Sequence, residues 1–69
     1  MSKQQLKQSI VEDLDAQLKE QMITQELRDK AALVVDQDLT ADDWNDIDNM
    51  STVEASDMVL SLARIKQGV

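Results

Sequence analysis

The sequence lacks cysteine, histidine and proline, and its single glycine, Gly68, lies next to the last residue. Without cysteine there is no disulfide, and without cysteine or histidine a structural zinc site lacks its usual ligands. Hairpin turns between strands favour Gly, Asn-Gly or Asp-Gly, and the interior of the chain contains none of these. These absences exclude disulfide- and zinc-stabilised folds and argue against a β-sheet.

The missing residue types also limit the chemistry. Ser-His-Asp and Cys-His nucleophile arrangements cannot form without histidine or cysteine, and one glycine near the end cannot build a phosphate-binding loop. A pair of catalytic carboxylates would need a substrate cleft, and 69 residues are too few to build a deep one. We therefore expect a protein that is not an enzyme and binds no cofactor.

A calcium site is also not expected. The segment that starts at Asp36 begins like a calcium-binding loop, with Asp36, Asp38 and Thr40 at its first, third and fifth positions. The sixth position requires glycine for a sharp turn but holds Ala41, and the twelfth requires a bidentate glutamate but holds Ile47. The two most demanding positions fail, so the sequence predicts no dedicated metal site.

Basic residues are scarce: 7 of them face 14 acidic residues, and the net charge is −7. Binding to a phosphate backbone or to an anionic membrane surface needs a basic face. We therefore expect no direct nucleic-acid binding and no membrane binding. No apolar run is long enough to span a bilayer, and the first residues lack the apolar stretch of a signal peptide, which favours a cytoplasmic location.

What the chain does contain is helix formers in a pattern. Gln, Lys, Glu, Leu, Ala and Met dominate its first half. The sequence predicts an all-α fold, a single helical domain over residues 1–69 built as a small bundle of three to four helices. A chain this short buries only about 60% of its unfolded surface, so its core is thin.

Capping residues mark the helix starts. Ser2 and Ser51 each precede a Gln or Glu by three residues, the spacing of a capping box, and Thr40 precedes two aspartates that favour a first turn. Around Thr40, Leu39 and Trp44 have the spacing of a hydrophobic staple. The predicted helical segments are a long N-terminal one at about 3–36, a short one at about 41–49 and a C-terminal one at about 52–66.

The long N-terminal segment carries two apolar stripes roughly 150° apart around a helix. The first comprises Leu6, Ile10, Val11, Leu14, Leu18 and Met22, and the second Ile23, Leu27, Ala31 and Val34. Either the helix breaks near residues 22–24 and folds back, with Thr24 as a second N-cap, or it stays straight and each half packs on something different. The lack of Gly, Pro or Asn near residue 23 favours a straight helix, whereas the thin core favours a break. We favour a break or kink slightly.

The C-terminal segment has one clear stripe. The i, i+3, i+4 spacing predicts a buried face made of Ala55, Met58, Val59, Leu62 and Ile65. Val53 and Leu60 lie off this face. In the short helix, Trp44 and Ile47 are expected to point inward.

Two stripes that face different ways also suggest assembly. A 69-residue monomer cannot cover both along a straight helix, and oligomerisation would bury the remaining apolar area. We therefore expect at least a homodimer. Its interface is predicted at Leu14, Leu18, Ile23 and Leu27.

The charges are distributed unevenly. Residues 36–57 contain eight acids and no base, whereas residues 3–30 contain five bases among six acids. Capping and solvation account for aspartates in a first turn, but not for this one-sidedness. Asp42 and Asp46 are like-charge neighbours four residues apart, which is mildly destabilising. A marginally stable protein that keeps this repulsion can be using the field to attract a basic partner.

Trp44 has two interpretations. Its staple position indicates a core residue, and its acidic surroundings indicate a binding hot spot as the alternative. Both hold in part if one edge of the ring stays exposed. The residues predicted to bind a partner are Asp38, Asp42, Asp43, Trp44, Asp46 and Asp48.

Two functions compete. The first is a small acidic regulator or inhibitor that docks on a basic surface of a larger protein, in its strongest form as a DNA mimic. Its size and charge are typical of phage and mobile-element products. The second is a structural helical homo-oligomer or assembly subunit.

Overall fold

Helix α1 (Lys3–Lys19) starts at the predicted capping box. The computed structural model describes the backbone of residues 2–67 and the side chains of residues 2–65. The Gln5 amide donates a hydrogen bond to the Ser2 hydroxyl (3.3 Å), and the Ser2 amide donates one to the Gln5 side-chain oxygen (3.2 Å). Both bonds of the box are therefore present.

The N-terminal segment breaks directly after α1, through a Schellman motif built without glycine. Gln21 has a positive φ of 63°. Its amide donates to the Leu18 carbonyl at 3.0 Å, and the Met22 amide donates to the Gln17 carbonyl at 2.9 Å. These bonds satisfy carbonyls that the end of a helix leaves without partners. The predicted break is confirmed, at a residue type that the left-handed conformation disfavours.

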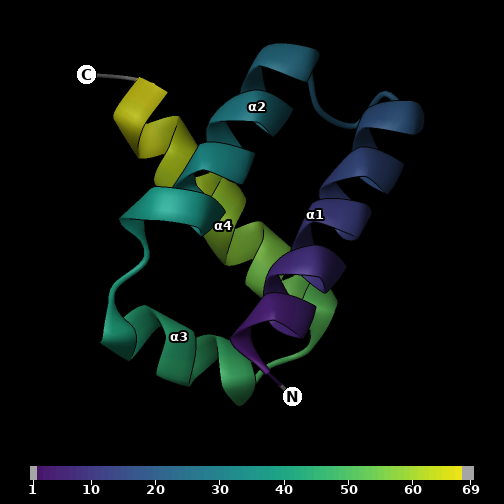
Figure 1. Ribbon diagram of the computed structural model, residues 1–69. Helices are drawn as coiled ribbons and strands as arrows, with labels where there is room; N and C mark the ends of the chain where they lie inside the picture. Colours follow the sequence, from purple (N-terminus) through teal and green to yellow (C-terminus); the bar gives the residue numbers. More distant parts are fainter. Residues whose placement is uncertain (1, 68–69) are drawn as a thin grey trace.

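Helix α2 (Gln25–Leu33) then packs against α1 (Figure 1). Thr24 is its N-cap, as predicted, and accepts a hydrogen bond from the Leu27 amide at 3.1 Å. The two helices are also linked by Arg28, whose Nε donates to an Asp15 carboxylate oxygen at 2.7 Å. This hydrogen bond is the main cause that raises the pKa of Arg28 above its ordinary value.

Beyond α2 the chain winds through one wider, π-helical turn, η1 (Val34–Asp38). Val34 and Val35 are both buried there. Lys7 of α1 forms an ion pair with Asp36 at 3.2 Å, which links this turn to α1. Because of η1 the helical segment ends at Asp38, two residues beyond the predicted end.

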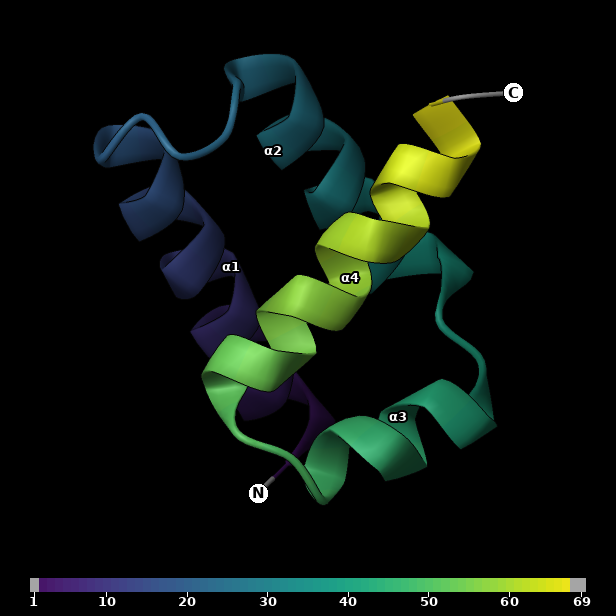
Figure 2. The same ribbon diagram turned by 180° about the vertical axis from the view of Figure 1, so that it is seen from behind.

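The last two helices are α3 (Ala41–Asp48) and α4 (Thr52–Gln67), each within one residue of its predicted bounds. Ser51 caps α4, because its hydroxyl accepts a hydrogen bond from the Glu54 amide at 3.2 Å. Figure 2 shows α4 crossing α1 and α2, while α3 lies at the end of the bundle where α1 and α4 begin. The described residues thus form four α-helices, one π-helical turn and no strand, which confirms the all-α class.

The buried face of α4 differs from the predicted one. Leu60, placed off the stripe by its spacing, is 2% exposed, and Ile65, placed on the stripe, is 66% exposed. The prediction was wrong at these two positions because α4 packs against both α1 and α2. Its buried face therefore also includes Ser56 and Ala63, small residues that a pattern of large apolar side chains does not reveal.

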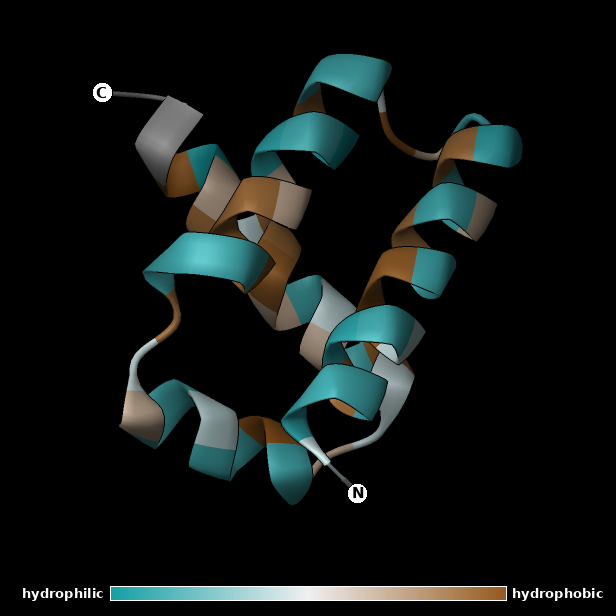
Figure 3. Ribbon diagram, in the orientation of Figure 1, coloured by the Kyte–Doolittle hydropathy of each residue, from teal (hydrophilic) through white to brown (hydrophobic). Residues whose placement is uncertain are grey.

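One cluster of buried side chains joins all four helices. In Figure 3 the hydrophobic segments lie mostly where the helices face one another. Leu14, Ile23 and Leu27 are buried in this cluster, and Leu18 packs half-buried against it. The four residues predicted for a dimer interface therefore pack in or against the core of a single chain. The homodimer stays a prediction, and these four residues no longer support it. No described helix combines the length and apolar character required to cross a membrane.

Candidate protein-binding surface

Helix α3 carries four aspartates, and two of them belong to its first turn. The Thr40 amide donates to Asp43 Oδ2 at 3.0 Å, and the Asp43 amide donates to Thr40 Oγ1 at 3.1 Å. Asp43 is half-buried and has a structural role as part of this capping box. Asp42 is exposed beside it, near the positive end of the helix dipole, where an acid is favourable.

The other two aspartates lie in the last turn of α3, where no basic residue accompanies them. The negative end of the helix dipole disfavours an acid there, and Asp46 is also four residues from Asp42. Asp48 borders the first turn of α4, whose positive end offsets part of this cost. Both Asp46 and Asp48 are exposed. Capping explains the acids at the start of α3 but not those at its end.

Ion pairs occur instead in and beside the hairpin formed by α1 and α2. Those among the described residues all lie in α1, α2 and η1: Lys7–Asp36 (3.2 Å), Arg28–Asp15 (2.7 Å), Arg28–Asp29 (3.3 Å) and Lys30–Glu26 (3.3 Å). The carboxylates of α3 form no ion pair with any residue that the structure describes. The surface of α3, at one end of the bundle, is therefore negatively charged.

Trp44 is half-buried and packs, like Leu39, against the edge of the core. The core interpretation of its staple position is therefore confirmed in part. Lys3 Nζ lies 5.1 Å from the centre of its ring, within cation–π distance. This lysine comes from the first turn of α1 and was not expected near Trp44, because nothing local in the sequence brings α1 to α3.

Helix geometry separates the tryptophan from part of the acidic surface. At roughly 100° per residue, Asp42 and Asp46 each lie about 160° around α3 from Trp44. Asp38 is exposed at the end of η1, outside this helix. The predicted partner-binding residues are thus not brought to one surface. Asp42 and Asp46 form an outer acidic face, whereas Trp44 and Asp48 lie on the side of α3 towards α1 and α4.

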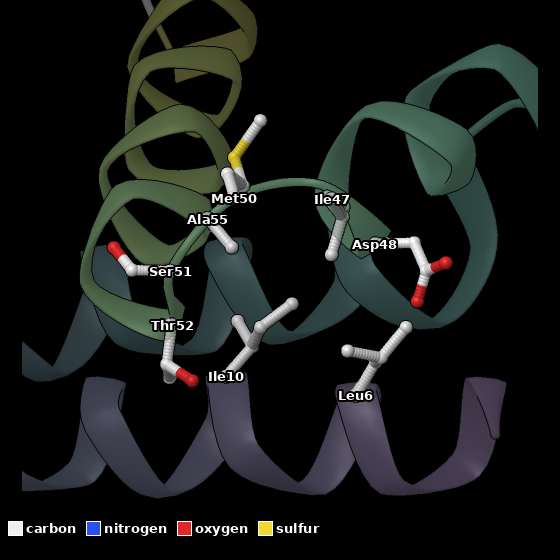
Figure 4. A pocket seen from close by; sticks show the side chains of 8 residues that line it. All are labelled: Leu6, Ile10, Ile47, Asp48, Met50, Ser51, Thr52 and Ala55. Atoms are coloured by element: carbon white, nitrogen blue, oxygen red, sulfur yellow. The ribbon is translucent and has the colours of Figure 1, made fainter. Parts of the chain in front are cut away.

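A pocket of about 140 Å³ lies between α1, α3 and α4 (Figure 4). The Asp48 carboxylate points beside Ile47 towards Leu6. The residues that line the pocket are Leu6, Ile10, Ile47, Asp48, Met50, Ser51, Thr52 and Ala55. The apolar pattern predicts most of these positions as core, but only the crossing of three helices leaves a hollow between them.

A wider hollow of about 450 Å³ lies between α1, the end of α2 and η1. The Lys7–Asp36 ion pair borders it, and its third charged residue, Glu12, accepts a hydrogen bond from the Gln8 side chain at 3.4 Å. Among the described residues, no group of three or more Asp, Glu, His or Cys side chains is arranged to hold a metal ion.

Comparisons with protein families, with curated proteins and with solved structures found no match.

Proposed function

We propose that the protein is a small acidic regulator that docks on a basic surface of a larger protein. The outer face of α3, made of Asp42 and Asp46, supplies the negative surface. The observation that supports this proposal is the contrast between the hairpin, where several acids form ion pairs with bases, and α3, where the described residues provide no paired base.

The energetic argument concerns Asp46. It lies at the negative end of its own helix dipole and near Asp42, so both local effects disfavour its charge. The presence of an aspartate whose charge destabilises the fold is explained if that charge attracts a basic partner protein. Electrostatic complementarity of this kind mainly raises association rates and selects partners with basic patches.

In its strongest form the proposal is that the carboxylates imitate DNA phosphates and occupy a nucleic-acid-binding site. The partner would then be a DNA-binding protein, and duplex DNA would compete with this protein for it. A cytoplasmic location and a phage or mobile-element source belong to the same proposal.

The test is a double variant, Asp42→Asn with Asp46→Asn, which leaves the capping residue Asp43 unchanged. The matched control is Glu12→Gln with Glu20→Gln, which removes the same charge from α1 and its C-cap. Immobilised protein captures partners from an extract of the source cells, and the captured proteins are quantified by mass spectrometry. We expect basic proteins to be lost from the aspartate variant and retained by the control.

Salt provides a second readout. Raising the salt from about 0.1 M to about 1 M shortens the Debye length from about 10 Å to about 3 Å and should release the captured proteins. The melting temperature of the aspartate variant should be nearly unchanged. Removing the charge of Asp42 at the helix start lowers stability, and removing that of Asp46 at the helix end raises it. Equal capture by both variants would remove the support for this function.

The second candidate, a homo-oligomeric assembly subunit, is favoured by one observation. Among the residues whose side chains the structure describes, four large apolar ones are more than half exposed: Met22, Leu33, Val53 and Ile65. Sedimentation at low and high salt separates the candidates, because apolar contacts between copies persist in high salt. A mass above the 7.8 kDa of one chain at both salt concentrations would favour the assembly subunit.

A further inference from the structure

We propose that the pocket between α1, α3 and α4 is the anchor site for a lysine side chain of the basic partner. This inference rests on the proposed function and adds a second, separate contact to the outer acidic face. It assigns a role to Asp48, which neither the capping of α3 nor the core explains.

The pocket has an apolar floor and a polar rim. Ile10, Ile47 and Ala55 form the base of the pocket and are each about 1% exposed, so its accessible apolar surface is that of the half-buried Leu6 and Met50. Asp48 and Thr52 are exposed at the rim. A side chain that runs across the mouth of the pocket can therefore lie against Leu6 while its end reaches the Asp48 carboxylate, which points towards Leu6 (Figure 4).

The size of the pocket fits a flexible aliphatic stem. An engineered apolar cavity of about 150 Å³ admits benzene, and this pocket has about 140 Å³. The four-carbon stem of lysine is of similar size, and lysine buries such a stem along apolar surface while its ammonium stays in water.

The charge of the site selects the ammonium. Asp48 forms no ion pair with any described residue, and it lies on a chain of net charge −7. A wholly apolar occupant would leave this carboxylate without a partner, whereas a lysine matches both the floor and the rim. A few side chains seated in pockets and surrounded by weaker contacts carry most of the binding energy in many protein complexes.

The experiment uses the full chain with methyl-labelled isoleucines, observed by NMR while Nα-acetyl-lysine-N-methylamide is added. The Ile10 and Ile47 methyl signals should shift and saturate, whereas the exposed Ile65 signal should stay in place. Nα-acetyl-norleucine-N-methylamide, which has the same stem without the ammonium, is the matched probe. We expect it to bind about two- to fivefold more weakly, which lies within the range for an exposed ion pair.

Two variants complete the test. Asp48→Asn should weaken binding of the lysine amide about two- to fivefold and leave binding of the norleucine probe unchanged. Ala55→Met should fill the floor and abolish binding of both probes, and its folding is checked by circular dichroism. Equal binding of the two probes to the unchanged chain, or shifts at Ile10 and Ile47 no larger than at Ile65, would overturn the assignment.

The two proposals fail separately. If lysine amide binds but the outer-face variant captures the same proteins as the control, the proposed function fails while the pocket remains a lysine site. If capture depends on Asp42 and Asp46 but neither probe reaches the pocket, only the lysine assignment fails.

Discussion

Replacing Gln21 by glycine should stabilise the protein, although glycine normally weakens a helical chain. Gln21 has a φ of 63°, and the left-handed conformation costs an L-residue roughly 1–2 kcal/mol. Glycine avoids this cost, but its greater freedom in the unfolded chain returns about 0.5–1 kcal/mol. The net effect expected for Gln21→Gly is a gain of about 0.5–1 kcal/mol.

The sign of this change distinguishes the two arrangements that the sequence allows. In a continuous helix over residues 3–36, Gln21 would be an interior position, and glycine there would destabilise by about 0.5–1 kcal/mol. In the observed hairpin the same substitution stabilises. Since 1 kcal/mol shifts the melting temperature of a domain this small by about 4–8 °C, the two cases differ by an easily measured amount.

The measurement is thermal and urea unfolding followed by circular dichroism at 222 nm. The matched control is Gln8→Gly, at an exposed position inside α1, which should lower stability by up to about 1 kcal/mol. Opposite shifts of the two variants support the hairpin. Equal destabilisation by both substitutions would refute the Schellman motif and restore the straight helix.

Three further predictions follow from burial and capping. Ser56→Ala should raise stability by about 1–3 kcal/mol in urea unfolding, because Ser56 is 0% exposed and its hydroxyl has no hydrogen-bond partner among the described residues. A lower urea midpoint would contradict this prediction. Thr40→Ala should cost about 1 kcal/mol, since it removes the cap of α3, and an unchanged midpoint would contradict the box. Leu14→Ala should cost about 2–5 kcal/mol at a 0%-exposed site, so retention of a sharp melting transition near the original temperature would contradict its place in the core.

The site could be predicted only in part. Thr40 and the aspartates after it were recognisable because capping chemistry is local. The separation of Asp42 and Asp46 from Trp44 follows from helix periodicity, which the prediction did not apply to this set. The approach of Lys3 to Trp44 and the pocket beside Asp48 depend on contacts between α1, α3 and α4. Residues far apart in sequence leave no local signal of such contacts.

The sequence by itself determined the all-α class, the helix starts at Ser2, Thr40 and Ser51, and the acidic character of α3. These features depend on side chains that bond or repel their own neighbours along the chain. Only the tertiary structure decided that the N-terminal segment breaks at Gln21, because burying two apolar stripes in one core outweighs the strain of a non-glycine residue with positive φ. The same packing decided that α4 buries Leu60 and exposes Ile65, since contact with two helices at once selects a different face from the one its spacing indicates.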